Sequence, residues 1–485
     1  MADVLAFAEG CFTGSPGDQV GVELEFLVHD VTDPALTVPI ARVTDALGGL
    51  TLPGGSVITF EPGGQIELSA PPGSLPVAVA ALQRDVGLVR SALGAAGLAL
   101  GRSGVDGHRR PLRQLHTPRY DAMAACLGEP YGPLMMCSTA SIQVNLDFGA
   151  DPFARWRRAH LFGPVLVAAF ANSPGPVPGF ESWLSGRQAI WLALDPSRTA
   201  PVGGDPAGAS QPIPDQSYGT FTGAGREPGH SCVACDGSDE GLLGPVPVVE
   251  SRSGSCSVCD GSGQHVAGSG PIDRAADSGL GCSCVLSDAV PAESASLKAA
   301  GMVDVPGRGY PPSDWAAYLQ AARLMLVREP DASVRQMGAG AHRFRDFHLA
   351  AGRSPTVDDL AYHATTLFPA VRPRGFMEIR YLDALGPVAW PVAVAVSYAL
   401  VIDDEAAAAA AEDALAVAGQ WAEAARCGLA SPAMRRAAVA AFRAAITALP
   451  RCGAPQSLID QVTDYAVRFV EPGRSPAADL LLESR

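Results

Sequence analysis

The stretch Phe60-Glu61-Pro62-Gly63-Gly64-Gln65-Ile66-Glu67-Leu68-Ser69 predicts a turn that leads into a strand with one polar face. Pro62-Gly63-Gly64 is typical of a turn, so Glu61 and Glu67 are expected on either side of a bend. Side chains alternate along a strand, and its polar face would hold Gln65, Glu67 and Ser69. Such a bend can direct two carboxylates at one ion.

Three further stretches, 21–26, 141–148 and 376–381, show the same alternation of polar and apolar residues. Their polar positions hold carboxylates, amides and one arginine: Glu23, Glu25, Gln143, Asn145, Asp147, Glu378 and Arg380. A solvated sheet surface would be richer in Lys, Ser and Thr. The pattern therefore predicts four strands whose polar faces line a common site.

Walls rich in carboxylate oxygens suit Mg²⁺, which keeps waters and substrate phosphates in its remaining coordination positions. An arginine beside the carboxylates can hold a phosphoryl oxygen. The combination indicates phosphoryl transfer, in which catalysis is mostly positioning and neutralisation of charge.

Several longer segments occur in the order found in plant-type and bacterial glutamate–cysteine ligases: VGVELEF, FEPGGQIELSAPP, PRYDAM, MMCSTASIQVNLDF, SGRQAIWLALDPSRTAP, DLAYHATTLFPAVRPRG and FMEIRYLD. The chain resembles this family over about residues 18–202 and 312–475, and most resembles its actinobacterial branch, which begins ergothioneine synthesis. Several long motifs in register are more specific than any one short pattern.

The resemblance implies a glutamine-synthetase-like α/β (α+β) fold, with a curved, largely antiparallel sheet that forms a funnel and helices outside it. It also implies that ATP phosphorylates the γ-carboxylate of L-glutamate and that the amine of L-cysteine attacks the acyl phosphate. The predicted Mg²⁺ ligands are Glu23, Glu25, Glu61, Glu67 and Glu378. Arg380 would neutralise the transferring phosphoryl group, and Glu67 and Arg380 are the predicted catalytic residues. The predicted substrate- and ATP-binding residues are Gln143, Asn145, Arg187, Trp191, Arg198, Arg372 and Arg374.

Two other functions remain open at this point. One is a carboxylate–amine ligase that activates glutamate but accepts a different amine, because the metal-binding wall would be the same. The other is a zinc-bearing interaction protein on an inactive ligase scaffold.

The composition limits the partners and the location. The net charge of −15 and the lack of a basic run argue against nucleic acid as a partner. Lys298 is the only lysine, so a catalytic lysine is not expected. Residues 1–10 do not resemble a signal peptide, and the apolar run 390–402 is too short to cross a membrane. We expect a cytoplasmic enzyme without a membrane partner; the oligomeric state is left open.

The chain is predicted to consist of an N-terminal part of the catalytic domain (1–202), an insertion (203–311) and a C-terminal part (312–485). The insertion is rich in Gly, Ser and Pro and contains six of the 11 cysteines. Cys232, Cys235, Cys256 and Cys259 have the spacing of a four-thiolate zinc site. Structural zinc, disorder and a redox pair are the interpretations of this segment that remain open.

Helices are predicted where apolar residues recur at helical spacing, between capping and terminating residues. They cover 74–97, 152–172, 312–328, 403–428, 431–449 and 455–471. The family resemblance implies, in addition, a short helix and loop near the active site at 358–369. Cys137 and His160 are expected to have packing roles, since neither has an evident catalytic partner nearby in sequence.

Overall fold

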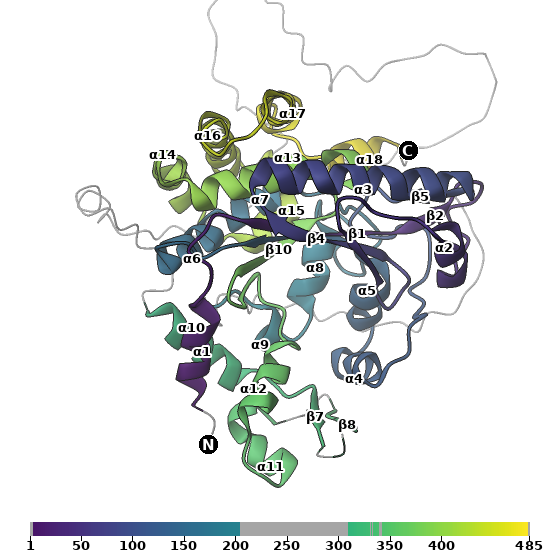
Figure 1. The fold of residues 1–485 in the computed structure, drawn as a ribbon, viewed down its shortest axis with the longest axis vertical. Coiled ribbons are helices and arrows are strands. Elements are labelled where there is room, and N and C mark those ends of the chain that lie inside the picture. Colours follow the sequence, from purple (N-terminus) through teal and green to yellow (C-terminus); the bar gives the residue numbers. More distant parts are fainter. Residues whose placement is uncertain (1–2, 204–308, 330, 332, 339–341, 484–485) are drawn as a thin grey trace, which may run out of the picture. The chain divides into compact units, whose positions relative to one another are not determined.

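The computed structural model describes residues 3–203, 309–329, 331, 333–338 and 342–483 (Figure 1). All of these residues belong to one unit. The predicted zinc ligands, Cys232, Cys235, Cys256 and Cys259, lie outside the described residues.

The centre of this unit is a six-stranded sheet in which every pair of neighbouring strands is antiparallel. Its spatial order is β3 (Val57–Phe60), β4 (Ile66–Gly73), β1 (Val20–Phe26), β6 (Ser141–Leu146), β10 (Met377–Asp383) and β9 (Val371–Pro373). The four predicted polar-faced strands are the adjacent strands β4, β1, β6 and β10. The expected α/β architecture with an antiparallel sheet is confirmed.

Two short pairs of strands lie outside the main sheet. They are β2 (Val28–Asp30) with β5 (Leu98–Leu100), and β7 (Leu326–Arg328) with β8 (Val334–Gln336).

The apolar face of the sheet packs on α3 (Leu75–Ala95) and α13 (Gly386–Ile402), which lie above the sheet in Figure 1. Helix α3 matches the predicted helix 74–97. Gly97, with φ of +71°, follows its last turn and permits the left-handed backbone there. Helix α13 is almost entirely buried, which explains why its sequence is apolar on all sides.

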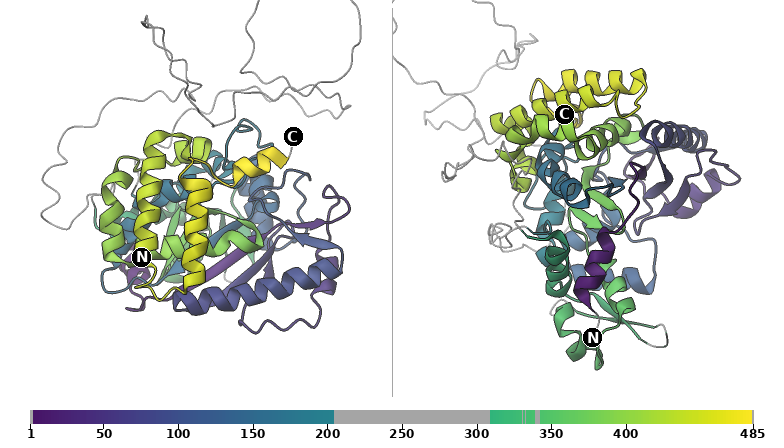
Figure 2. Two further views of the ribbon diagram at one scale, coloured as in Figure 1. Left: turned by 90° about the horizontal axis from the view of Figure 1, so that it is seen from above. Right: turned by 60° about the vertical axis from the view of Figure 1, so that its left-hand side comes forward.

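The C-terminal helices are α14 (Asp404–Leu415), α15 (Trp421–Cys427), α16 (Pro432–Ala448), α17 (Gln456–Tyr465) and α18 (Ala477–Glu483), with 3₁₀ turn η3 (Gly428–Ala430) and π-helical segment η4 (Ala466–Val470). Helices α14, α16 and α17 pack on α13. Figure 2 shows α14, α16 and α17 side by side from above. The predicted single helix 403–428 is wrong, because the segment divides into α14 and α15.

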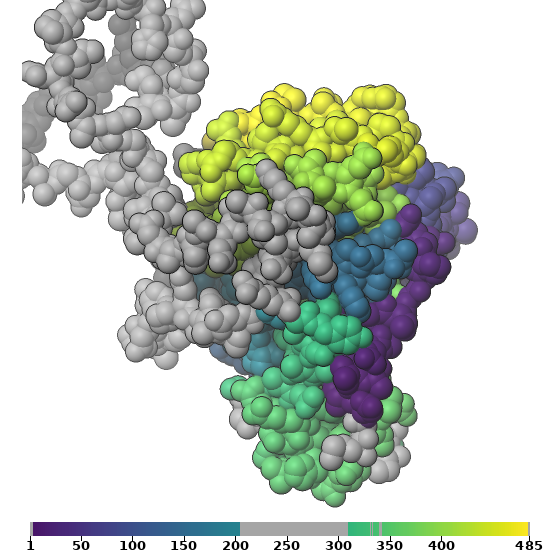
Figure 3. All heavy atoms as spheres, turned by 90° about the vertical axis from the view of Figure 1, so that its left-hand side faces the viewer, coloured from purple at the N-terminus to yellow at the C-terminus, as the bar shows by residue number. Residues whose placement is uncertain are grey.

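The remaining helices lie around this core of sheet and helices. They are α1 (Val4–Phe12), α2 (Ile40–Ala46), α4 (Pro118–Leu127), α5 (Tyr131–Ser138), α6 (Pro152–Leu161), α7 (Gly163–Ala169), α8 (Gly186–Ala193), α9 (Pro196–Thr199), α10 (Pro311–Ala321), η2 (Phe344–Asp346), α11 (Phe347–Ala351) and α12 (Val357–Ala364). Two of them pack against the helices named above: α6 against α13 and α14, and α7 against α15 and α16. Helix α1 packs against α10, as the purple and teal-green atoms in Figure 3 show.

Two predicted helix boundaries in this group are wrong. The segment 152–172 is two helices, α6 and α7, because the chain turns at Phe162 and Gly163 cannot carry a side chain beside the ring of Trp421. The segment 312–328 is helical only to Ala321, and its last residues form β7. Among the described residues, no single helix is long and apolar enough to cross a membrane; α13 and α14 meet those criteria only together, as a pair bent by 96°.

Candidate active site

The polar face of the sheet borders an open cavity of about 230 Å³. Strand register explains how it forms. Across β1 and β4, Glu25 lies opposite Glu67, and across β1 and β6, Glu23 lies opposite Gln143. Most of the predicted site residues line this cavity: Glu23, Glu25, Glu61, Glu67, Gln143, Arg187, Trp191, Arg372, Arg374, Glu378 and Arg380.

The turn before β4 depends on two glycines and one buried amide. A Cβ on Gly63 would lie 2.4 Å from the carbonyl oxygen of Cys137, and Gly64 has φ of +90°. The side chain of Gln65 donates to the carbonyl oxygen of Thr139 at 2.9 Å and accepts from Gly63 N at 3.0 Å. Gln65 therefore fastens the turn that carries Glu61, a role the alternation pattern did not reveal.

Three carboxylates converge at one end of the cavity. One ligand oxygen from each of Glu25, Glu61 and Glu67 lies within 4.8 Å of the other two. Thr59 and Ser69 hydroxyls donate to Oε1 of Glu67 at 2.7 and 3.0 Å, and Ser141 N donates to Oε2 of Glu25 at 2.9 Å. Each of these two carboxylates is thus held in place and keeps oxygens for a further ligand.

The electrostatics of this group favour a bound cation. Burial, together with the negative charges of Glu25 and Glu67, raises the pKa of Glu61 to about 8. Burial and the charge of Glu25 also raise the pKa of Glu67. A divalent ion would remove this repulsion, and three oxygen donors are the chemistry that Mg²⁺ requires. The residues present therefore fit the metal implied by the resemblance.

Glu23 lies apart from this trio, within the same cavity. Its Oε1 accepts a hydrogen bond from Nδ2 of Asn145 at 3.0 Å. Burial and the charges of Glu378 and Glu67 raise the pKa of Glu23. Asn145 thus contributes by orienting Glu23, and its own Oδ1 is buried with no hydrogen-bond partner among the described residues.

Glu378 has a different environment from the other four glutamates. It is 1% exposed, and its carboxylate pairs with Arg372 at 2.6 Å, Arg380 at 3.0 Å and Arg374 at 3.1 Å. Burial alone would raise the pKa of Glu378, but the charges of Arg380, Arg372 and Arg374 hold it well below its usual range. Its oxygens are used by guanidinium groups, so Glu378 does not lie among the clustered metal-ligand oxygens.

These arginines form the cationic side of the cavity. Nη1 of Arg380 also donates to Oε1 of Gln143, which links the cationic side to β6. Nε of Arg380 is buried and has no hydrogen-bond partner among the described residues. One carboxylate does not balance three guanidinium groups, so this side of the cavity has positive charge to offer an anionic substrate.

Arg187 and Trp191 lie on α8 at a third side of the cavity. The guanidinium carbon of Arg187 is 5.6 Å from the ring centre of Trp191, and its Nη2 donates to the carbonyl oxygen of Arg380 at 2.8 Å. Nη1 of Arg187 is buried with no hydrogen-bond partner in the described part of the chain. Arg187 is therefore placed to receive a substrate oxygen.

Arg198 lies away from the cavity, although it was predicted to bind substrate. Its side chain is 0% exposed and donates to the carbonyl oxygens of Thr366 and Arg323, both at 3.0 Å. It also pairs with Asp195 at 3.3 Å. These bonds connect α9 to the segments at Thr366 and Arg323, so the side chain of Arg198 stabilises the fold.

Sequence reasoning assigned no role to Arg119 and Tyr120, which also line the cavity. Arg119 is held by Thr365, whose hydroxyl and carbonyl oxygens accept from it at 2.9 and 2.8 Å. The segment PRYDAM contributed to the family resemblance, but the spacing of its residues did not indicate that the first turn of α4 faces the site.

Cys137 and His160 lie where packing roles were expected. Cys137 is buried in a cluster with Met123, Met136, Met325 and Phe368, and burial raises the pKa of its thiol to about 11. His160 packs against Trp156 with ring centres 4.5 Å apart and ring planes tilted by 53°.

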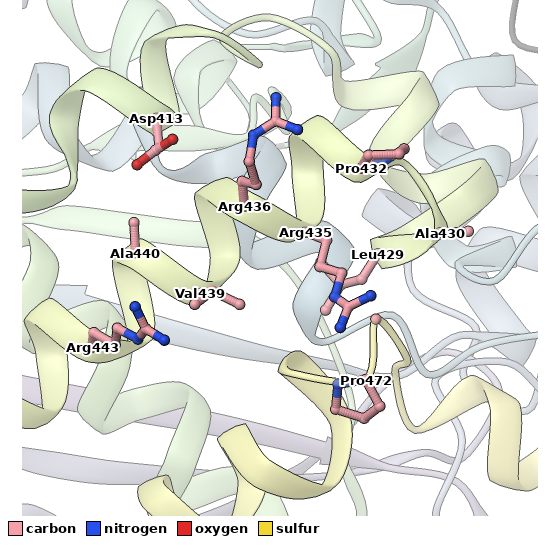
Figure 4. Close-up of a pocket in the computed structure, with 11 residues that line it drawn as sticks. Asp413, Leu429, Ala430, Pro432, Arg435, Arg436, Val439, Ala440, Arg443 and Pro472 are labelled. Carbon is pink, nitrogen blue, oxygen red and sulfur yellow. The ribbon is translucent and has the colours of Figure 1, made fainter. Parts of the chain in front are cut away.

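A second hollow lies on the C-terminal helices and has a different character (Figure 4). Arg435, Arg436 and Arg443 of α16 border it, with Asp413 of α14 on its other side. None of the predicted site residues lines it, so the candidate active site is the cavity on the polar face of the sheet.

Comparisons with known proteins show which family the chain resembles. The model of glutamate-cysteine ligase family 2 matches residues 19–206 and 292–483. The chain is 33% identical over 496 residues to the glutamate–cysteine ligase EgtA of Mycobacterium tuberculosis, covering 97% of this chain and 90% of that protein. It is also 33% identical to EgtA of Mycolicibacterium smegmatis, over 96% of this chain and 86% of that protein.

A plant relative matches a shorter region. The chloroplastic glutamate–cysteine ligase of Arabidopsis thaliana is 34% identical over 152 residues, which cover 29% of this chain and 28% of that protein. The break in the family match, between residues 206 and 292, falls inside the predicted insertion, whose boundaries at 203 and 311 stay a prediction. The chain belongs to glutamate-cysteine ligase family 2.

Proposed function

We propose that this protein is an ATP-dependent glutamate–cysteine ligase that forms γ-glutamylcysteine, ADP and phosphate from L-glutamate, L-cysteine and ATP. The observation that carries the proposal is the shared cavity, in which a carboxylate trio faces an arginine-rich side. The first group suits a metal–nucleotide and the second suits carboxylate or phosphoryl oxygens. Family membership adds the reaction class.

Glu25, Glu61 and Glu67 would hold Mg²⁺, with Glu23 as an adjacent ligand oriented by Asn145. The ion, when bound, would neutralise charge on the ATP phosphates. We assign Glu378 to ordering Arg372, Arg374 and Arg380 instead of to metal binding. Their guanidinium groups would then hold the carboxylate and phosphoryl oxygens that carry charge as the reaction proceeds.

The proposed reaction has two steps. A γ-carboxylate oxygen of glutamate attacks the terminal phosphorus of ATP, and the bond to the bridging oxygen of ADP breaks. The amine of cysteine then attacks the acyl carbon, phosphate leaves with the former carboxylate oxygen, and the nitrogen loses a proton. Arg380 and Arg187 would orient the two anionic reactants, which supplies much of the rate enhancement in reactions of this type.

A panel of amines tests the proposal. ADP release would be measured with ATP, Mg²⁺ and L-glutamate, together with L-cysteine, L-serine, glycine or other amines, and products identified by mass. Turnover that depends on cysteine supports the assignment. Turnover only with a different amine would identify the alternative carboxylate–amine ligase, and no turnover with any amine would favour an interaction protein on an inactive scaffold.

The proposal includes a cytoplasmic location, where ATP and amino acids are available, and use of the product for ergothioneine or another low-molecular-weight thiol.

Structural zinc at Cys232, Cys235, Cys256 and Cys259 remains a prediction from their spacing alone. Zinc content would be compared between the purified protein and a Cys232→Ser/Cys259→Ser variant. Loss of about one zinc per chain in the variant would support the site, and equal zinc content would contradict it.

A further inference from the structure

Strand β10 changes which of its residues face the cavity part of the way along its length. Ile379 pairs with Val144 of β6, and Leu382 pairs with Ile142, so two residues of β10 lie opposite Gln143 alone. This β-bulge shifts the alternation by one residue. Glu378 before the bulge and Arg380 within it face the cavity, whereas beyond it Asp383 lies opposite Ser141.

Asp383 is 2% exposed and all of its oxygens have partners. Oδ2 accepts from the backbone N of Asn172 at 2.9 Å and from the hydroxyl of Ser173 at 2.7 Å. Oδ1 accepts from the hydroxyl of Ser185 at 2.9 Å. A buried carboxylate with three donors is costly to disturb.

The two serines connect Asp383 to the first turn of α8. The Ser185 hydroxyl oxygen caps the helix by accepting from Gln188 N at 3.2 Å, and the Ser173 hydroxyl oxygen accepts from Arg187 N at 3.0 Å. Because each hydroxyl proton is given to Asp383, both oxygens are oriented to accept from the helix. The position of the Arg187 backbone is therefore set through Asp383.

Asp383 also affects the pKa of the Arg187 side chain. Burial lowers the pKa of the Arg187 guanidinium, and Asp383, followed by Glu25, counteracts this effect. Asp383 thus supplies negative charge that is not exposed in the cavity. Glu25 makes its hydrogen bonds with Ser141 N and Gln143 Nε2 and none with Arg187, and Nη1 of Arg187 remains without a hydrogen-bond partner among the described residues.

We propose that Asp383 is a positioning residue of the ligase, which fixes the start of α8 through Ser173 and Ser185 so that Arg187 binds an anionic group of the substrates. This inference rests on the proposed function, because Arg187 needs a substrate to hold. Asp383 itself makes no contact with substrate in this account.

A double-mutant cycle tests the proposal: kcat and KM for glutamate and for ATP would be measured for Asp383→Asn, Arg187→Gln and the double variant. The amide has one accepting atom, so it cannot accept from Asn172 N and Ser173 on one side and from the Ser185 hydroxyl on the other, and it lacks the charge. We expect each single variant to lose about 30- to 100-fold in kcat/KM for the same substrate, since displacements of about 1 Å cost this much. The double variant should lose no more than about threefold beyond Arg187→Gln alone.

Independent losses that multiply in the double variant would overturn the proposal, as would an Asp383→Asn enzyme with unchanged kcat/KM. Asp85→Asn is the matched control, because Asp85 is 0% exposed and accepts from Gly54 N and Ser56 N at 2.8 and 3.1 Å behind the sheet. It should lower stability and leave kcat/KM unchanged.

A second route applies if Asp383→Asn fails to fold. Ser173→Ala removes the link to Arg187 N and keeps the carboxylate, and it should raise the same KM that Arg187→Gln raises. A Ser173→Ala enzyme with wild-type KM values would count against the proposal. An inactive wild-type protein would instead overturn the proposed function together with this inference, whereas an active wild type with multiplying losses overturns the inference alone.

Discussion

Nε of Arg372 lies 2.6 Å from Oε2 of Glu378, and both side chains are buried in the wall of the cavity, on the adjacent strands β9 and β10. The register places Glu378 directly opposite Arg372, so the pair follows from the pairing of the strands. Arg374 and Arg380 share the same carboxylate. Glu378 thus gathers three cations that would otherwise repel one another.

We predict that Glu378→Gln lowers both stability and activity without changing the dependence on Mg²⁺. Removing one member of a buried ion pair leaves the other charge uncompensated, and typically costs about 3–5 kcal/mol. Urea unfolding would measure the stability, and initial rates over a Mg²⁺ titration would measure the metal dependence. A shift of that titration to higher Mg²⁺ would contradict the assignment and restore Glu378 as a metal ligand.

Glu67→Gln should change the Mg²⁺ dependence of the activity and leave stability unchanged, the reverse of what we expect for Glu378→Gln. It removes one charged oxygen from the trio with Glu25 and Glu61, so we expect at least about a 100-fold loss of kcat and a requirement for higher Mg²⁺. Stability without metal should not fall, because the repulsion within the trio decreases. Glu405→Gln, at a surface carboxylate whose side chain is 79% exposed, is the control and should match wild type. An unchanged Mg²⁺ titration for Glu67→Gln would remove the metal assignment.

Arg198→Gln should affect stability far more than substrate binding. The fully buried guanidinium holds two carbonyl oxygens, and losing these bonds should cost roughly 2–4 kcal/mol. KM for each substrate should stay within about threefold of wild type. A large rise in KM with unchanged melting temperature would show instead that Arg198 reaches the substrate.

His363 should make the protein less stable in mild acid. Burial, and the charge of Arg198, lower the pKa of His363 to about 3, and its Nε2 lies 3.1 Å from the carbonyl oxygen of Leu319. The unfolded chain, with a histidine pKa near about 6.5, binds the proton more readily. The contribution of neutral His363 to the free energy of unfolding is therefore complete above about pH 6.5 and is lost as the pH falls toward about 3.

At about pH 5.5 this loss amounts to about 1.4 kcal/mol. The difference in unfolding free energy between pH 7.5 and 5.5 should shrink by this amount in His363→Gln. His348→Gln, at an exposed histidine, should keep the wild-type difference. Equal pH dependence in wild type and His363→Gln would refute the assignment.

Much of the site could be predicted because strand alternation is local. A residue's neighbours two positions away decide which face it shares, so Glu23, Glu25, Glu67, Gln143 and Glu378 were placed on polar faces from sequence alone. The order of the strands, and the convergence of Glu25, Glu61 and Glu67, required the register across β1 and β4.

What could not be predicted depends on contacts distant in sequence. Arg198 looks like a substrate ligand in its motif, but its partners Thr366 and Arg323 lie more than a hundred residues away. Glu378 differs from the other glutamates because it pairs with Arg372 on the neighbouring strand β9, a contact that the alternation within β10 does not reveal. The bulge at Arg380 and Tyr381 has no marker in sequence such as glycine, so the alternation gave no reason to assign Asp383 to the site.

The central claim is that the cavity activates glutamate as an acyl phosphate and transfers it to cysteine. The most direct test uses L-glutamate labelled with ¹⁸O in its γ-carboxylate, together with ATP, Mg²⁺ and L-cysteine, and mass analysis of both products. The account predicts γ-glutamylcysteine and phosphate that carries one labelled oxygen. Phosphate without label, or no γ-glutamylcysteine despite ADP release, would contradict it.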